Sequence, residues 1–134
     1  MNGRACSAIL LLTLTGLPAQ GHHSVIGMYN PEMKVTLTGV VAEFHFVGPH
    51  PYVVLDADPD ETGTWRWHLE FDSRRELASV GVTENTFRPG DEVIVTGDYA
   101  RDGSEQMYVR ELLRPEDGLL YECPRFRPSL KVAR

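Results

Sequence analysis

The segment MKVTLTGVVAEFHF, residues 33–46, decides the fold because its apolar side chains alternate along the chain and change phase once. The first phase holds Val35 and Leu37, and the second holds Val40, Ala42, Phe44 and Phe46. Alternation with period two predicts a β-strand. A phase change at Gly39 predicts a bulge that bends one long strand. A small closed sheet needs such a strand, because one strand then serves both halves.

The chain downstream predicts four more strands and one short helix. The predicted strands are residues 51–56, 65–71, 92–100 and 107–113, and residues 57–64 form an acidic connection. Ser73 followed by Glu76 is a capping box that predicts a helix, which Gly81 ends. Arg88–Asp91 predicts a turn, and Asp102-Gly103 predicts a hairpin. Upstream, residues 22–32 predict an irregular lead-in with a turn at Asn30-Pro31.

This order of elements predicts an all-β protein with one short helix, arranged as a five-stranded OB-like barrel. The alternative is a small antiparallel β-sandwich with one helix. The barrel domain spans residues 22–114. Residues 115–134 form a basic C-terminal tail that is expected to lie outside the core, either mobile or across the acidic body of the domain.

Residues 1–21 predict a signal peptide, and therefore a periplasmic or secreted protein. Arg4 supplies the positive charge, and residues 5–17 form an uncharged stretch that is too short for a membrane-spanning helix. Ala19-Gln20-Gly21 places small residues for cleavage before His22. Cleavage after Ala19 and an N-terminus that stays anchored in the membrane are the alternatives. No later segment is long enough to span a membrane.

Composition predicts a single globular domain. The chain has 134 residues, of which 42% are hydrophobic and 24% are charged, so disordered and fibrous classes are excluded. The net charge of −6 argues against a nucleic-acid partner. Cys123 is the only cysteine outside the signal segment. We expect it to be buried and inert, the alternative being a disulfide between chains.

Several motifs together resemble a family of exported bacterial proteins known only as a domain of unknown function. Its members begin the mature chain with His-His-Ser, as residues 22–24 do, and carry a Leu-Thr-Gly strand, an Asn-Pro-His turn and a Pro-Gly-Asp-Glu turn. The matching segments here are residues 35–41, 49–50, 88–93 and 101–104. Gly48 departs from the usual Asn before Pro49-His50. The resemblance implies export and a compact β-domain, and it implies no activity.

Histidines are the best candidates for chemistry, because imidazole is a common ligand of zinc and copper. Cleavage before His22 would let its ring and the new amine chelate one metal ion. His23 can add its ring, and His50, fixed between two prolines, is the best ligand from the domain itself. Nitrogen ligands favour copper(II). After cleavage at Ala19, His22 would stand third and could still chelate copper. The alternative is a solvated terminus with no function.

Other candidate groups have simpler explanations. His45 and His68 are expected to be solvent-facing strand residues, and sequence does not decide whether they approach His50. Trp65 and Trp67 could form a stacking platform, but they are in phase with Leu69 and are expected in the core. The acidic residues Asp56, Asp58, Asp60 and Glu61 lack the spacing of a calcium loop, so we expect a solvated connection.

No catalytic signature is present in the sequence. It lacks Gly-x-Ser-x-Gly, His-Glu-x-x-His, a phosphate-binding glycine loop and Cys-x-x-Cys, so the protein is not expected to be an enzyme. Two hypotheses follow. The first is a periplasmic protein that binds copper or another transition metal through His22, His23 and His50. The second is a non-catalytic OB-like interaction module for a protein, glycan or lipid-derived partner.

Overall fold

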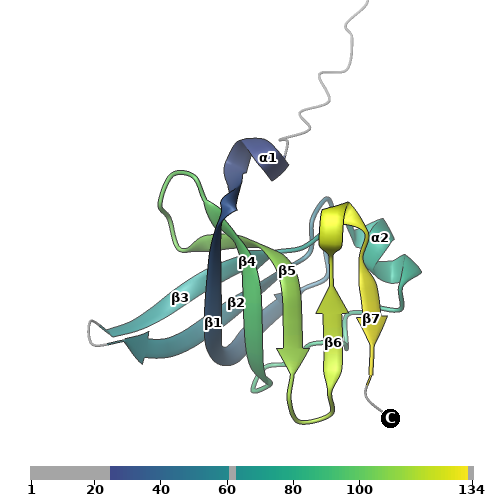
Figure 1. The fold of residues 1–134 in the computed structure, drawn as a ribbon. Helices are drawn as coiled ribbons and strands as arrows, with labels where there is room; N and C mark the ends of the chain where they lie inside the picture. Colours follow the sequence, from purple (N-terminus) through teal and green to yellow (C-terminus); the bar gives the residue numbers. More distant parts are fainter. Residues whose placement is uncertain (1–24, 61–62, 133–134) are drawn as a thin grey trace, which may run out of the picture.

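The computed structural model describes residues 25–60 and 63–132. These residues form a mostly β protein with a short helix between the third and fourth strands, as the sequence predicted (Figure 1). The elements in chain order are α1 (Val25–Met28), β1 (Tyr29–His45), β2 (Tyr52–Asp60), β3 (Gly63–Glu70), α2 (Arg74–Ser79), β4 (Glu92–Ala100), β5 (Gln106–Arg114), β6 (Leu119–Glu122), the 3-10 turn η1 (Pro124–Phe126) and β7 (Ser129–Lys131).

The described strands form one sheet in the order β3-β2-β1-β4-β5-β6-β7, with antiparallel neighbours. Strand β3 also pairs in parallel with the start of β5, where His68 lies opposite Gln106. Strands β1 to β5 therefore close into a ring, and β6 pairs with the other half of β5. The prediction of five strands was wrong in number, because β6 and β7 extend the sheet beyond the ring.

Strand β1 serves two partners, as the sequence predicted for the long first strand. Its residues Tyr29 to Val40 pair with β4, and its residues from Gly39 to His45 pair with β2. The predicted bulge at Gly39 is wrong, because the register shifts lie between Val41 and Glu43 and between Asn30 and Lys34. The side chains therefore change face after Val41, which is buried.

Gly39 is instead a point of close contact between strands. A Cβ atom built on Gly39 would lie 2.5 Å from the backbone oxygen of Asp56 and 2.8 Å from the Cα of Ala57. Only glycine lets β1 approach β2 so closely while it is also paired with β4. The sequence therefore singled out Gly39 correctly, but its role is close contact between strands and not a bulge.

Two predicted element bounds needed correction. The lead-in 22–32 is not irregular throughout, because α1 is a helical turn and β1 begins at Tyr29, with Pro31 inside a register shift. The connection 57–64 is shorter than predicted, because β2 continues to Asp60 and β3 begins at Gly63. Both differences follow from antiparallel pairing, which extends a strand for as long as a neighbour is available.

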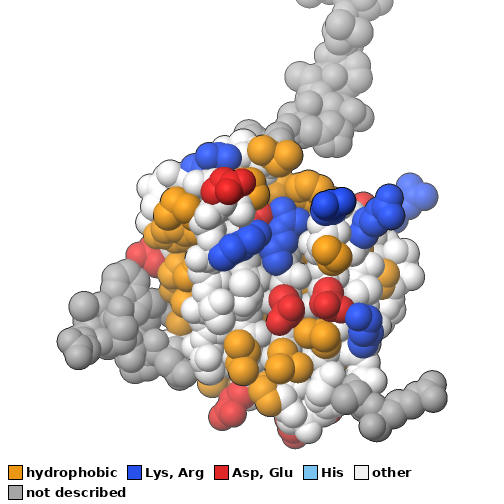
Figure 2. All heavy atoms as spheres, viewed as in Figure 1, with side chains coloured by type: hydrophobic (Ala, Val, Ile, Leu, Met, Phe, Trp, Pro, Cys, Tyr) orange, Lys and Arg blue, Asp and Glu red, His pale blue; other side chains and the backbone are white. Residues whose placement is uncertain are grey.

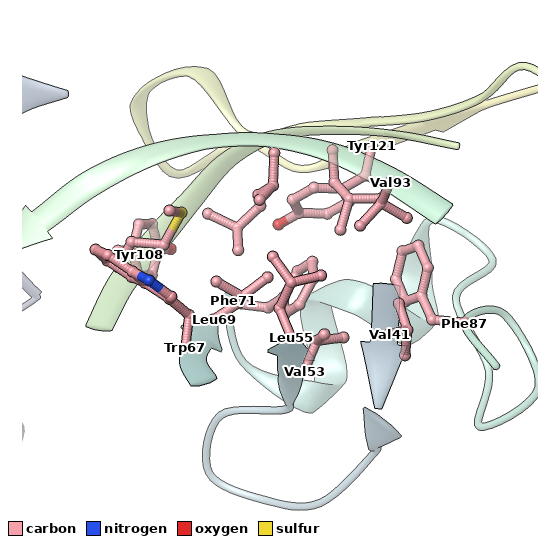
Figure 3. Packing of buried hydrophobic residues seen from close by; sticks show 14 of the residues in the cluster. Val41, Val53, Leu55, Trp67, Leu69, Phe71, Phe87, Val93, Tyr108 and Tyr121 are labelled. Atoms are coloured by element: carbon pink, nitrogen blue, oxygen red, sulfur yellow. The ribbon is translucent and has the colours of Figure 1, made fainter. Parts of the chain in front are cut away.

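The core lies inside the ring of strands (Figure 3), and Leu77 of α2 belongs to it. Trp67, Leu69 and Phe71 point into it, which confirms the predicted alternation along β3. Phe71 is the centre of an aromatic cluster, with ring centroids 5.7 Å from Phe87 and 5.1 Å from Tyr121. Aromatic residues bury large areas, so this cluster contributes much of the stabilisation from burial.

Local signals for the helix and the hairpin were correct. The Ser73 hydroxyl accepts from the backbone N–H of Glu76, and the Glu76 carboxylate accepts from the backbone N–H of Ser73. Leu77 is the buried residue of α2. Gly81 follows the helix with φ of 94°, and Gly103 turns the β4–β5 hairpin with φ of 78°. Positive φ favours glycine at both positions.

The C-terminal segment is part of the folded domain, which corrects the prediction of a tail at residues 115–134. Strand β6 pairs with β5, and β7 pairs with β6. Leu119, Tyr121 and Cys123 are buried in the core. These residues alternate with period two, a strand signal that was present in the sequence. Truncation before residue 119 would therefore remove part of the core.

Across residues 25–60 and 63–132, no helix has the length and apolar character that crossing a membrane requires. The predicted signal peptide, residues 1–21, lies outside the described residues and stays a prediction.

Candidate functional site

His50 lies in the loop between β1 and β2, and its ring is held from one side. Its Nδ1 lies 3.0 Å from the backbone oxygen of Phe71. A carbonyl oxygen only accepts hydrogen bonds, so Nδ1 carries the proton of the neutral ring. Nε2 then keeps its lone pair, which is the arrangement of a metal-binding histidine with an oriented ring. One third of the His50 side chain is exposed, so solutes can reach it.

Glu70 connects His50 to the beginning of the folded domain. One carboxylate oxygen of Glu70 lies 3.8 Å from His50 Nδ1, and the other accepts a 2.7 Å hydrogen bond from the Tyr29 hydroxyl. Burial, together with the neighbouring Glu70 carboxylate, raises the pKa of Tyr29 well above its usual range, so the hydroxyl remains a donor. The first residue of β1 and the predicted ligand His50 therefore share one carboxylate.

His45 and His68 belong to an aromatic stack on the outer side of the ring of strands. Their rings stack on opposite faces of Tyr52, with centroid distances of 4.5 Å to His45 and 4.4 Å to His68. Glu43 binds His45 Nε2 at 2.6 Å. Burial lowers the pKa of His68, which keeps its ring neutral to lower pH. Both residues are half-buried members of a stack, so the expectation of solvent-facing strand residues was only partly right.

The described histidines, His45, His50 and His68, do not form one cluster. Tyr52 separates His45 from His68, and no hydrogen bond or ring stacking found in the described residues joins either of them to His50. Among residues 25–60 and 63–132, no three His, Cys, Asp or Glu side chains are close enough together to hold a metal ion. The predicted ligands His22 and His23 lie outside the described residues.

The tryptophan and acidic-loop alternatives are settled in part. Trp67 is 9% exposed and packs against Tyr99, so it belongs to the core as expected. The Trp65 side chain lies outside the described part of the structure. Asp56 is a strand residue that binds Arg66 in a two-pronged ion pair of 2.9 and 3.3 Å. The side chains of Asp58, Asp60 and Glu61 lie outside the described part of the structure, so the rest of the acidic connection stays a prediction.

A buried polar cluster lies beneath β5 and β6, and the sequence did not predict it. The carboxylate of Asp72, only 5% exposed, accepts hydrogen bonds from the Tyr108 hydroxyl and, at 2.7 Å, from the Cys123 thiol. The nearby Tyr121 hydroxyl is buried without a hydrogen-bond partner in the described structure. Cys123 is free and fully buried, as expected, and burial, reinforced by Asp72, raises its pKa to about 11.

Alkaline pH should destabilise the protein through Cys123. The unfolded thiol has a pKa of 9.0 and the folded thiol about 11, so the folded state holds the proton more tightly. This stabilisation, about 2–3 kcal/mol, is complete below pH 9 and is lost as pH rises to 11. We expect Cys123→Ala to lose less free energy of unfolding than the wild type between pH 8.5 and 11, as measured by urea denaturation. Parallel losses would contradict the buried-thiol account.

A family model matches residues 10–108, which is most of the chain, and it is described as a family of unknown function. The chain belongs to this family, DUF6152. The match covers all five histidines and ends inside β5, before Cys123 and the strands β6 and β7. No curated protein and no solved structure matches the chain.

Membership of DUF6152 confirms the resemblance to a domain of unknown function and supplies no activity. The function of this member therefore has to be argued from its own residues. His50 combines a fixed ring, an available nitrogen and access to solvent in a loop of the domain.

Proposed function

We propose that this protein is an exported, non-catalytic metal-binding protein in which His50 and the N-terminal His22 and His23 hold one transition-metal ion, preferably copper. The ring of five strands serves as an OB-type barrel that carries His50 in its β1–β2 loop. The observation that carries the proposal is the hydrogen bond from His50 Nδ1 to the Phe71 carbonyl, which leaves Nε2 as an electron-pair donor.

The nearby carboxylate supports the same assignment. Glu70 lies 3.8 Å from His50 Nδ1 and adds negative charge behind the ring, and a carboxylate in this position is a common partner of a metal-binding histidine. Such a ring and its carboxylate fit a divalent ion with nitrogen ligands, and copper(II) binds this donor type most tightly of the common divalent metals.

The distance along the chain also favours a shared site. Tyr29 hydrogen-bonds to Glu70, which places the first residue of β1 beside the group that flanks His50. Only Ser24 separates His23 from α1, so covalent geometry keeps both terminal histidines within about 10 Å of the start of that helix.

Copper(II) titration of the processed protein tests the proposal, with mass spectrometry to define its N-terminus and electron paramagnetic resonance to count nitrogen ligands. We expect one site, weakened at least about tenfold by His50→Ala and about tenfold by Glu70→Gln. His45→Ala is the matched control, because His45 also lies near β2 but contacts Tyr52 instead. Its affinity should equal that of the wild type.

The nitrogen count separates a built site from a terminus that binds metal alone. His50→Ala should lose one nitrogen from the spectrum, and copper should stabilise the wild type by about 2.7 kcal/mol at one hundred times the dissociation constant. Unchanged affinity and an unchanged nitrogen count in His50→Ala would remove the domain from the site and overturn the proposal.

An interaction module is the second candidate, favoured by the stack of His45, Tyr52 and His68. In OB-type barrels the outer face of strands two and three is a common ligand surface, and this stack lies across that face. A test of this surface has to use a point substitution, because deleting residues 115–134 would remove Leu119 and Tyr121 from the core. Substitution of Tyr52 by alanine tests this face, and a partner recovered equally well by that variant would exclude it.

A further inference from the structure

A pocket of about 530 Å³ lies on a different part of the surface from His50. Its walls come from α1, the first half of β1, the outer side of β5 and the η1 turn. Ile26 and Phe126 give it an apolar rim, and both are exposed. Figure 2 shows hydrophobic side chains next to a group of Lys and Arg side chains on this face. A pocket of this size can enclose a small organic molecule.

The pocket has a surplus of positive charge. Lys34, Arg110 and Arg125 line it. Asp98, which is 1% exposed, accepts hydrogen bonds from both Lys34 and Arg110 and neutralises one of these two charges. Arg125 has no ion pair in the described structure and adds a second positive charge.

Two acidic residues also line the pocket, and they reduce this surplus from two positive charges to one. Glu122 is bound by Lys131 at 2.5 Å, which leaves Glu111 as the acidic lining residue without an ion pair in the described structure. A net positive site is unusual on a chain whose total charge is −6. It therefore attracts anions that the rest of the surface repels.

Arg110 is fixed in place by its neighbours. Its guanidinium lies 4.7 Å from the ring centroids of both Tyr108 and Phe126, and it donates at 3.2 Å to the backbone oxygen of Cys123. Arg125 and Phe126 have φ of 51° and 59°, the left-handed region that non-glycine residues rarely adopt. This turn places the Phe126 ring over Arg110, so a cation and an apolar wall meet at one point.

We propose that this pocket binds a small organic carboxylate with an apolar chain. Lys34 and Arg125 hold the carboxylate, Arg110 supplies fixed positive charge beneath it, and Ile26 and Phe126 cover the chain. The small surplus of positive charge suits a head group with a single negative charge. The site shares no lining residue with the surroundings of His50, although α1, which follows His22 and His23 in the chain, forms one of its walls.

Titration with dodecanoate below its micelle concentration tests this pocket, using calorimetry and NMR of the arginine Nε–H groups. We expect saturable one-to-one binding that weakens as salt is added and that shifts the Arg110 signal. Arg125→Gln should weaken binding about threefold, and Phe126→Ala about tenfold. Arg75→Gln, on the exposed face of α2, is the matched control and should bind as the wild type does.

Three comparison probes separate the contributions of charge and chain. Acetate has the head group alone and dodecanol has the chain alone, so each should bind at least about tenfold more weakly than dodecanoate. Dodecanol binding as tightly as dodecanoate would overturn the proposal, and so would unchanged affinity in both pocket variants. Binding to anionic vesicles without binding to monomeric dodecanoate would also overturn it, because the surface would then recognise a membrane.

Discussion

Replacing Asp98 with alanine is expected to lower the free energy of unfolding by about 3–5 kcal/mol. Asp98 is 1% exposed and accepts from Arg110 Nε at 2.8 Å and from Nη2 at 2.6 Å, while Lys34 binds its other oxygen. Without the carboxylate, the Arg110 guanidinium remains against the rings of Tyr108 and Phe126 as a poorly hydrated charge. Lys34 is half exposed and recovers its hydration, which places the expected loss near 3 kcal/mol.

Asp56→Ala is the matched control for this substitution. Asp56 also binds an arginine, Arg66, from a strand of the same sheet, but the Asp56 side chain is 40% exposed and that of Arg66 63% exposed. Exposed ion pairs contribute less than about 1 kcal/mol, so the control should unfold at nearly the wild-type urea concentration. Urea denaturation of both variants, followed by tryptophan fluorescence, measures the difference. Equal losses of unfolding free energy in the two variants would show that burial does not strengthen the ion pairs of Asp98.

Features encoded in short stretches of sequence could be predicted correctly. The capping box of Ser73 and Glu76 and the hairpin at Asp102-Gly103 each depend on a few adjacent residues, so the turn chemistry is visible without the fold. The alternation of Trp67 and Leu69 likewise revealed the buried face of β3. In each case the interacting groups lie close together along the chain.

Features that depend on distant pairing were missed. The sequence predicts a tail from residue 115 because the five-strand layout ends before it, although Leu119 and Tyr121 already alternate, and only pairing with β5 makes them core residues. The acceptor of the His50 ring is the carbonyl of Phe71, which is 21 residues away. The partners of Asp72 are also remote in sequence. Sequence spacing does not encode such contacts, because they require the closed ring.

Gly39→Ala is expected to lower the free energy of unfolding by about 3 kcal/mol. The added Cβ would lie 2.5 Å from the Asp56 backbone oxygen and 2.8 Å from the Ala57 Cα. Both atoms belong to backbone that is paired in the sheet, so neither can move away as a flexible side chain would. Gly39 also pairs with Val93 on β4, and relief on one side therefore strains the other.

Gly48→Ala separates this collision from the general effect of adding a methyl group to glycine. Beyond its two chain neighbours, no heavy atom lies within 4 Å of a Cβ built on Gly48, and its backbone does not require positive φ. The variant should therefore stay within about 0.5 kcal/mol of the wild type, whereas Gly39→Ala should also weaken amide protection from hydrogen exchange along β1 and β2. A Gly39→Ala protein as stable as Gly48→Ala would mean that β1 and β2 can separate without cost. The close contact between β1 and β2 at Gly39 would then not be required for β1 to pair with both β2 and β4.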